Sequence, residues 1–152
     1  MYFEDLSQYR YYTPKPFCDV WNIGWLDRDH EYSLGSVDNT TIGIIRDLVF
    51  GQYPRVRPHV NVIRGNHPCN LCELAELIPA REAELVAGSS ELWIPCRNGI
   101  FAAPSMLLHY LSYHNYKPPA AFLEALANLP PEKPFDGQME FELRNRAVRS
   151  PH

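Results

Sequence analysis

The sequence predicts a small single α+β domain with a treble-clef-like zinc knuckle, a β-hairpin and a helix. Three observations carry this prediction: the pair Cys69 and Cys72, a hairpin pattern over residues 91–103, and a following helix with His109 and His114. Two thiolates at Cys-x-x-Cys spacing can bind one tetrahedral Zn²⁺ from a single turn, and a second element must then supply two more ligands. Knuckle, hairpin and ligand-bearing helix follow one another in the order of a treble clef.

We therefore predict one zinc site, formed by Cys69, Cys72, His109 and His114. Residues five apart on a regular helix are separated by about 140° around its axis, so the two histidines can face one ion only if the helix ends between them. Asn115 is an acceptable left-handed cap, and the prolines that follow stop the helix.

The assignment leaves alternatives open. His67 is an alternate ligand, because it lies just before the knuckle and spacing alone does not place it. The Cys-x-x-Cys pair also fits a redox dithiol or two packed thiols, and a histidine on an apolar helix can be a core residue. A thioredoxin-like motif needs a strand leading directly into a helix at the cysteines, which this sequence lacks.

Composition indicates short elements and one core. The chain has 152 residues, 14 prolines and 12% aromatic residues, which favours an α+β fold with rigid, aromatic-packed loops over a helical bundle. Residues 1–129 are expected to form the domain. Residues 130–152 are expected to be a C-terminal tail that is partly ordered at best, because they show little apolar periodicity.

The remaining elements are placed by local patterns. The aromatic residues of the first 25 positions should pack onto the domain, with a strand over 21–26. A helix should run from an N-cap at Asp38 or Asn39 to Gly51. Residues 53–62 are expected to form an extended edge segment, and residues 73–87 two helical pieces divided by Pro79.

The second half of the chain carries the hairpin and two helices. The hairpin should turn at Asn98 and Gly99 with positive φ at both, and Pro104 should open the ligand helix. A last helix begins at Pro119 and carries an apolar stripe that should dock on the hairpin.

Charge and cysteine usage limit the function classes. The net charge of −4 gives no general attraction to phosphate backbones, so nucleic-acid binding is not expected. The N-terminus lacks the regions of a signal peptide and no apolar run could span a membrane, so we expect a cytoplasmic protein. Thiols stay reduced there, which makes Cys18 and Cys96 expected structural thiols.

Four pieces of the sequence also carry a resemblance: Tyr2 to Ser7, Asn22 to Asp27, Arg64 to Cys72, and Ala102 through His109, His114 and Tyr116 to Phe122. Together they resemble a family of small standalone bacterial proteins classed as a domain of unknown function. The resemblance extends from residue 2 to about residue 127. It implies a coherent domain and no particular activity.

The residues of the predicted metal site are compatible with three functions. In the first, zinc is structural and the protein binds and occludes a protein partner, for example as an immunity or antitoxin-like protein against a basic toxin. In the second, the site belongs to a metal-dependent hydrolase or nuclease with His67 as general base, although no Asp-His or His-His pair is evident on a preceding strand. In the third, Cys96 and His109 act as nucleophile and base, but no third orienting group is found.

Overall fold

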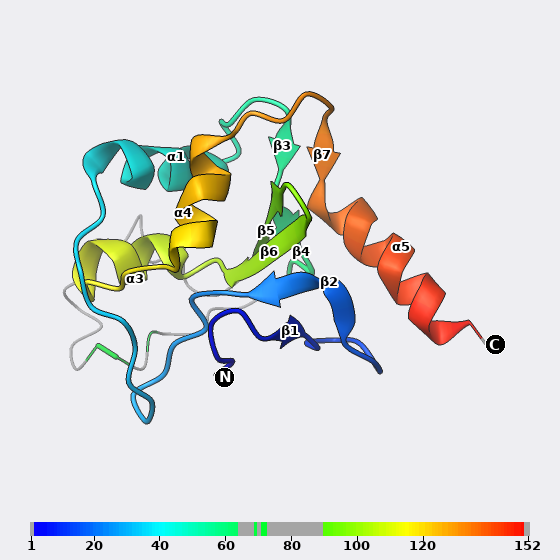
Figure 1. Ribbon diagram of the computed structural model, residues 1–152, viewed down its shortest axis with the longest axis horizontal. Helices are drawn as coiled ribbons and strands as arrows, with labels where there is room; N and C mark the ends of the chain where they lie inside the picture. The colour runs from blue at the N-terminus through cyan, green and yellow to red at the C-terminus, as the bar shows by residue number, and fades with distance from the viewer. Residues whose placement is uncertain (1, 64–68, 70, 73–89, 151–152) are drawn as a thin grey trace.

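A computed structural model describes residues 2–63, 69, 71, 72 and 90–150 of the chain. At the centre of this part lies a five-stranded sheet with the strand order β1-β2-β6-β5-β4 (Figure 1). Its strands are β1 (Gln8–Tyr9), β2 (Phe17–Asn22), β4 (His59–Val60), β5 (Glu91–Cys96) and β6 (Gly99–Pro104). A second, parallel pair joins β3 (Val56–Arg57) to β7 (Phe135–Asp136).

Helices cover the sheet from both sides. The helices are α1 (Asn39–Val49), α3 (Leu107–Tyr113), α4 (Ala120–Ala127) and α5 (Gly137–Arg149). In Figure 1, α1, α3 and α4 lie together, and α5 lies apart at the other side of the strands. The prediction of a small α+β domain is confirmed.

The pleat of β5 and β6 separates two apolar cores. Leu92, Ile94 and Phe101 belong to the core beneath α1, α3 and α4. Trp93 and Ala102, one position along, belong to the core beneath α5. Side chains alternate between the two faces of a strand, so an apolar residue at nearly every position indicates a strand buried on both faces.

The hairpin of β5 and β6 forms over the residues that the sequence predicts, but its turn differs. Cys96 pairs with Gly99, so the two central residues are Arg97 and Asn98, and neither has a positive φ. Gly99 is needed for another reason. A Cβ at this position would collide with the backbone carbonyl of Asp19 and the ring of Trp21 in the neighbouring strand β2.

Helix α1 confirms its prediction. The carboxylate of Asp38 accepts a hydrogen bond of 2.7 Å from the backbone N–H of Thr41, and Gly51 follows the helix with φ +70°. The strand expected over residues 21–26 is shifted, because β2 ends at Asn22 where its pairing with β6 stops. Pro104 closes β6 instead of opening the ligand helix, since it is still paired with β5.

The aromatic N-terminal segment packs onto the domain, as predicted. The rings of Tyr9 and Phe17 stack with centroids 5.4 Å apart, and both are buried. Tyr9 also contacts Trp93 edge to face, which places β1 over the core on the α5 side of the sheet.

Within the predicted C-terminal tail, residues 135–149 form β7 and α5. Asp136 caps α5 by accepting from the backbone N–H of Met139 at 3.1 Å, and Phe141 is buried in the second core. Arg144 then pairs with Asp19 of β2 at 2.7 Å. One buried ring among charged residues gives too weak a periodicity for the sequence to reveal this helix.

The edge strand and the last of the predicted helices occur where the sequence predicts them. β4 lies at an edge of the sheet, which confirms the extended edge segment. α4 begins after Pro119, as expected. Phe122 of α4 docks on the hairpin, with its ring edge to face against Phe101 at 5.6 Å.

The helical pieces predicted over residues 73–87 lie outside the described part. Among the helices described, none is both long and apolar enough to cross a bilayer.

Candidate metal centre

The position of α3 follows from the hairpin. β6 ends at Pro104 and three residues later α3 begins, with Leu107, Leu108 and Leu111 buried in the core against α1. The connection is fixed by the backbone N–H of Ser105, which donates to the carbonyl of Ser90 at 3.0 Å. Burial of the leucine face sets the rotation of the helix and places His109 on the side away from those leucines, where it is also buried, with 2% of its surface exposed.

The end of α3 brings the second histidine to the same place. His114 is the C-cap, with φ −122°, and Asn115 follows in the left-handed region with φ +52°. The helix therefore unwinds between His109 and His114, as the sequence predicts, and the two imidazoles can converge.

Residues Tyr32 to Gly35 clamp the segment that follows α3. The hydroxyl of Tyr32 donates to the carbonyl of His114 at 2.9 Å, and the backbone N–H of Gly35 donates to the carbonyl of Asn115 at 2.9 Å. Leu34 forms an isolated bridge with Tyr116. These contacts hold the backbone of His114 without using its side chain.

The buried ring of Tyr116 ties this segment to the N-terminus. Its hydroxyl donates to one carboxylate oxygen of Asp5 at 2.8 Å, and the other oxygen accepts the backbone N–H of Gly24 at 2.9 Å. Residue spacing in the sequence did not indicate a role for Asp5, Gly24 or Tyr116 near the site. Each lies in one of the pieces that carry the family resemblance, and that was the only sign of their role.

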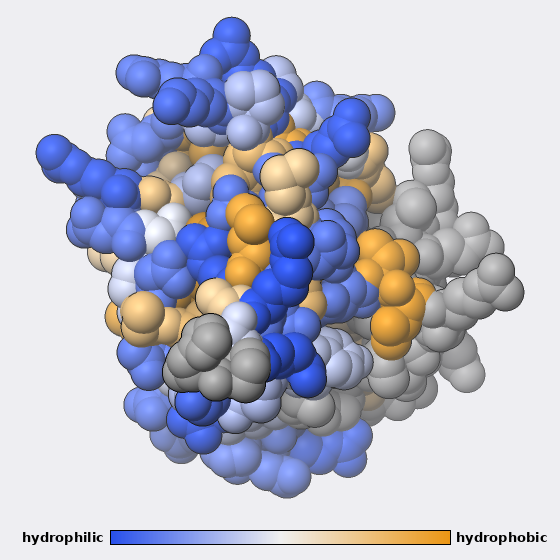
Figure 2. All heavy atoms as spheres, turned by 90° about the vertical axis from the view of Figure 1, so that its right-hand side faces the viewer, coloured by the Kyte–Doolittle hydropathy of each residue, from blue (hydrophilic) through white to orange (hydrophobic). Residues whose placement is uncertain are grey.

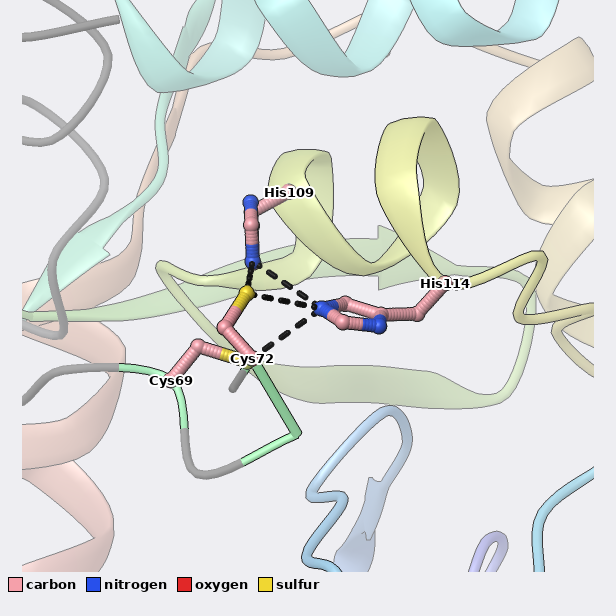
Figure 3. A group of neighbouring side chains, drawn as sticks. All are labelled: Cys69, Cys72, His109 and His114. Atoms are coloured by element: carbon pink, nitrogen blue, oxygen red, sulfur yellow. Dashed lines mark hydrogen bonds between the residues drawn. The ribbon is translucent and has the colours of Figure 1, made fainter. Parts of the chain in front are cut away.

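Four donor atoms meet beside α3 (Figure 3). The Sγ of Cys72 lies 3.1 Å from Nε2 of His109 and 3.2 Å from Nε2 of His114, and the two Nε2 atoms are 3.1 Å apart. The Sγ of Cys69 lies 3.4 Å from Nε2 of His114. All four donors lie within 4.8 Å of one another. The structure thus brings together the four side chains that the sequence selects, close enough to bind a metal ion.

These separations fit the edges of a coordination tetrahedron. Ligand bonds of about 2.3 Å to sulfur and about 2.0 Å to nitrogen at tetrahedral angles give sulfur–nitrogen edges of about 3.5 Å and nitrogen–nitrogen edges of about 3.3 Å. The three sulfur–nitrogen distances and the nitrogen–nitrogen distance given above are within a few tenths of an ångström of these values.

Burial makes the cluster receptive to a cation. Desolvation raises the pKa of the Cys69 thiol to about 11, and burial, together with the nearby His114, lowers the pKa of His109 to about 4. Burial lowers the pKa of His114 as well. The histidines are therefore neutral near pH 7, which is the form that binds metal, whereas the Cys69 thiolate needs a positive charge beside it.

The surroundings of His109 leave one polar atom without a partner. Its Nδ1 is buried and makes no hydrogen bond within the part of the chain that the structure describes. Its ring packs at 5.1 Å from the ring of Tyr113. Metal-bound histidines normally donate this second N–H to an oxygen, so the ring orientation here depends on packing.

The other candidate residues of the sequence analysis lie elsewhere. His67, the alternate ligand, is outside the described residues. Cys96 lines a pocket near the hairpin turn, whereas His109 meets Cys72, so the proposed Cys96 and His109 pair is not formed. Cys18 is exposed, which contradicts its expected structural role, and none of the four cysteines is in a disulfide.

An Asp-His pair, which the sequence analysis missed, lies in the loop after Leu26. Nδ1 of His30 is 2.7 Å from Oδ1 of Asp27, and the His30 ring stacks on Tyr2 with centroids 3.7 Å apart. The two residues are three apart in a turn, whereas the catalytic pair of a hydrolase was expected on a strand.

Comparison with known proteins places the chain in a family. The model of a domain of unknown function, DUF7919, matches residues 1–127. The chain belongs to this family. The match confirms the resemblance noted from the sequence, and it includes all four members of the metal cluster. No curated protein and no solved structure matches the chain.

In this chain, the possible metal-binding cluster of two cysteines and two histidines draws its donor atoms from one loop and from one helix and its C-cap. The cluster has four protein donors for four tetrahedral positions. Such a set suits an ion that holds two segments of chain together, because substrate would need a further open position.

Proposed function

We propose that this domain is a zinc-stabilised protein-binding module whose metal is structural. The observation that carries the proposal is the set of four convergent donor atoms, two thiol sulfurs and two imidazole nitrogens. Tetrahedral sites with two sulfur and two nitrogen ligands favour zinc among the common divalent metals. The ion would fix the loop of Cys69 and Cys72 to the end of α3.

The choice of binding over turnover rests on coordination. A catalytic zinc keeps a position for water, typically with three protein ligands, whereas a structural zinc is closed by four. Each of the four residues here directs a donor atom to the same point (Figure 3). A closed site leaves the outer surface of the domain to supply its activity.

Charge supports a basic protein partner. The chain carries a net charge of −4. Burial raises the pKa of Tyr2, and the negative charges of Glu4, Asp5 and Asp27 raise it further. Surfaces of opposite charge associate quickly, so an acidic domain favours a basic protein partner. Such a partner would be a basic toxin, which this domain would occlude in the manner of an immunity or antitoxin-like protein.

The first experiment measures metal content. Protein purified without added metal should contain one zinc per chain by elemental analysis, and the cobalt-substituted form should show the absorption of a tetrahedral S₂N₂ site. An octahedral cobalt spectrum with exchangeable water, or protein that folds fully and binds no metal, would contradict a closed structural site.

The second experiment separates binding from turnover. Pull-down from a cell extract at low and high salt should recover a basic protein whose binding weakens as salt screens the charges. In parallel, the zinc-loaded domain is assayed against nucleic acids, esters and peptides. Multiple turnover that is lost in His30→Ala or His67→Ala, with zinc content unchanged, would instead favour the metal-dependent hydrolase or nuclease.

A further inference from the structure

A pocket of about 770 Å³ lies between the β5–β6 turn and α4, and none of the four metal-cluster residues lines it. It is bounded by Arg97 at the turn, by α4, and by Pro131 after that helix. Pockets of about 300–1,000 Å³ with apolar walls and a few polar groups are the usual size and character of small-molecule sites. The volume is therefore sufficient for a ligand.

Two aromatic rings form one wall of this pocket. Trp21 of β2 and Phe101 of β6 lie with ring centroids 6.1 Å apart and tilted by 49°, and both line the pocket. α4 contributes Ala121 and Ala125 to the lining. Because alanine side chains are small, this part of the pocket leaves room beside the rings for a flat apolar group.

Two opposite charges lie on different walls. Arg97 is exposed at the hairpin turn and Glu124 is exposed on α4, and both line the pocket. Within the described residues neither side chain forms an ion pair, with the other or with any other group. A guanidinium and a carboxylate that share a pocket without neutralising each other match a ligand that carries both charges.

We propose that this pocket binds an aromatic α-amino acid or a similar aromatic zwitterion. The ring lies against Trp21 and Phe101, the ligand carboxylate accepts hydrogen bonds from Arg97, and the ligand ammonium donates to Glu124. A purely apolar ligand would leave both charges unused, and an anion or a cation alone would use only one. None of the metal-cluster residues lines this site, so it is separate from the metal centre.

The test uses three indole compounds that differ in the charged groups they carry. L-tryptophan carries both groups, 3-indolepropionate lacks the ammonium, and tryptamine lacks the carboxylate. Isothermal titration of the full-length zinc-loaded protein should give L-tryptophan a Kd on the order of 1 mM or tighter, and each of the other two should bind about tenfold more weakly.

Two charge variants assign each contact. Arg97→Gln should weaken L-tryptophan and 3-indolepropionate but not tryptamine, whereas Glu124→Gln should weaken L-tryptophan and tryptamine but not 3-indolepropionate. Arg146→Gln and Glu142→Gln, at exposed positions of α5, are the matched controls. Ala121→Trp, at an exposed position of α4, should fill the pocket and abolish binding while zinc content and folding are kept.

Alkylation provides a readout that does not depend on binding heat. Cys96 lines the pocket, and the exposed Cys18 lies outside it. L-tryptophan should slow the reaction of Cys96 with iodoacetamide, measured by peptide mass mapping, and leave the rate at Cys18 unchanged. Equal binding of the three compounds, insensitivity to both charge variants, or no protection of Cys96 at tenfold the expected Kd would overturn the proposal.

Discussion

At the scale of single residues, the cluster depends on each of its four donors. Cys72 has the closest contacts, since its sulfur lies within 3.2 Å of both Nε2 atoms. Removal of one ligand from a structural zinc site usually costs most of the metal affinity, which in small zinc domains is of order 10 kcal/mol and appears as folding free energy.

We expect Cys72→Ser to lose its zinc and to melt at a lower temperature or to become insoluble. Zinc content and thermal unfolding measure both effects. Cys18→Ser, at an exposed thiol, should change neither. A Cys72→Ser protein with the wild-type melting temperature would show that the metal does not stabilise the fold.

A second residue of interest is Glu91, which is only 2% exposed. Its carboxylate accepts from Asn61 Nδ2 at 2.7 Å and from the indole N–H of Trp93 at 3.1 Å, and no cation among the described residues pairs with it. Burial raises its pKa to about 7, although the hydrogen bonds from these neighbours oppose the shift. The folded protein therefore binds a proton at Glu91 more tightly than the unfolded chain does.

The raised pKa of Glu91 sets the sign of a pH dependence. The stability that the folded protein gains from the proton on Glu91 is fully present below the unfolded pKa of 4.5 and is lost as the pH rises through about 7. The free energy of unfolding differs between these two limits by an amount on the order of 3 kcal/mol. Glu91→Gln, which resembles the protonated form, should therefore unfold at higher denaturant concentration than wild type at pH 8 and at a similar one at pH 5.

Urea unfolding at both pH values measures this prediction. Glu132→Gln, at an exposed position, is the control and should follow the wild type at each pH. If Glu91→Gln and wild type lost stability in parallel between pH 5 and pH 8, ionisation of Glu91 would not be the cause.

At the scale of elements, Phe141 is the buried ring through which α5 packs on the domain. Its ring lies edge to face against Trp93 at 5.8 Å and Phe17 at 5.9 Å. The outward side of this region is mostly hydrophilic, with separate hydrophobic patches (Figure 2). Most of the stabilisation by α5 should therefore come from its inner face.

Phe141→Ala should lower the free energy of unfolding by about 3–5 kcal/mol, because it removes a buried ring and leaves a cavity in the second core. Leu143→Ala, two residues away and 49% exposed, is the matched control and should cost far less. Denaturant titration compares the two. Similar losses for both variants would mean that α5 acts through its helicity and not through this contact.

At the scale of the whole molecule, the second core joins the two ends of the chain. Tyr9 and Phe17 near the N-terminus meet Phe141 near the C-terminus across Trp93 of β5. The family match ends at residue 127, before β7 and α5. The C-terminal elements thus cover a face of the sheet that belongs to the matched region.

Truncation after Leu129 tests this arrangement. It removes β7 and α5, exposes the core that they cover, and should give a protein that is insoluble or lacks cooperative unfolding even with zinc added. A second truncation that ends at Ser150 keeps α5 whole. It is the control and should unfold like the full chain. A stable, zinc-loaded domain of residues 1–129 would restore the boundary predicted from the sequence.

The sequence by itself determined the features that depend on near neighbours in the chain. The spacing of Cys69 and Cys72, the cap at Asp38 and the left-handed Asn115 that ends α3 are local, and each occurs where predicted. The helix end mattered most, because it permits His114 to turn back toward His109.

Only the tertiary structure decided what depends on residues far apart in the chain. Gly99 looked like a turn residue, but contact with β2 explains it, and the docking of α5 could not be recognised from the single buried ring of Phe141. The hydrogen bonds that join Asp5 to Gly24 and Tyr116 likewise cannot be predicted from the spacing of apolar residues. Local patterns reflect backbone preference and solvent exposure, whereas packing across the sheet is fixed only when distant segments meet.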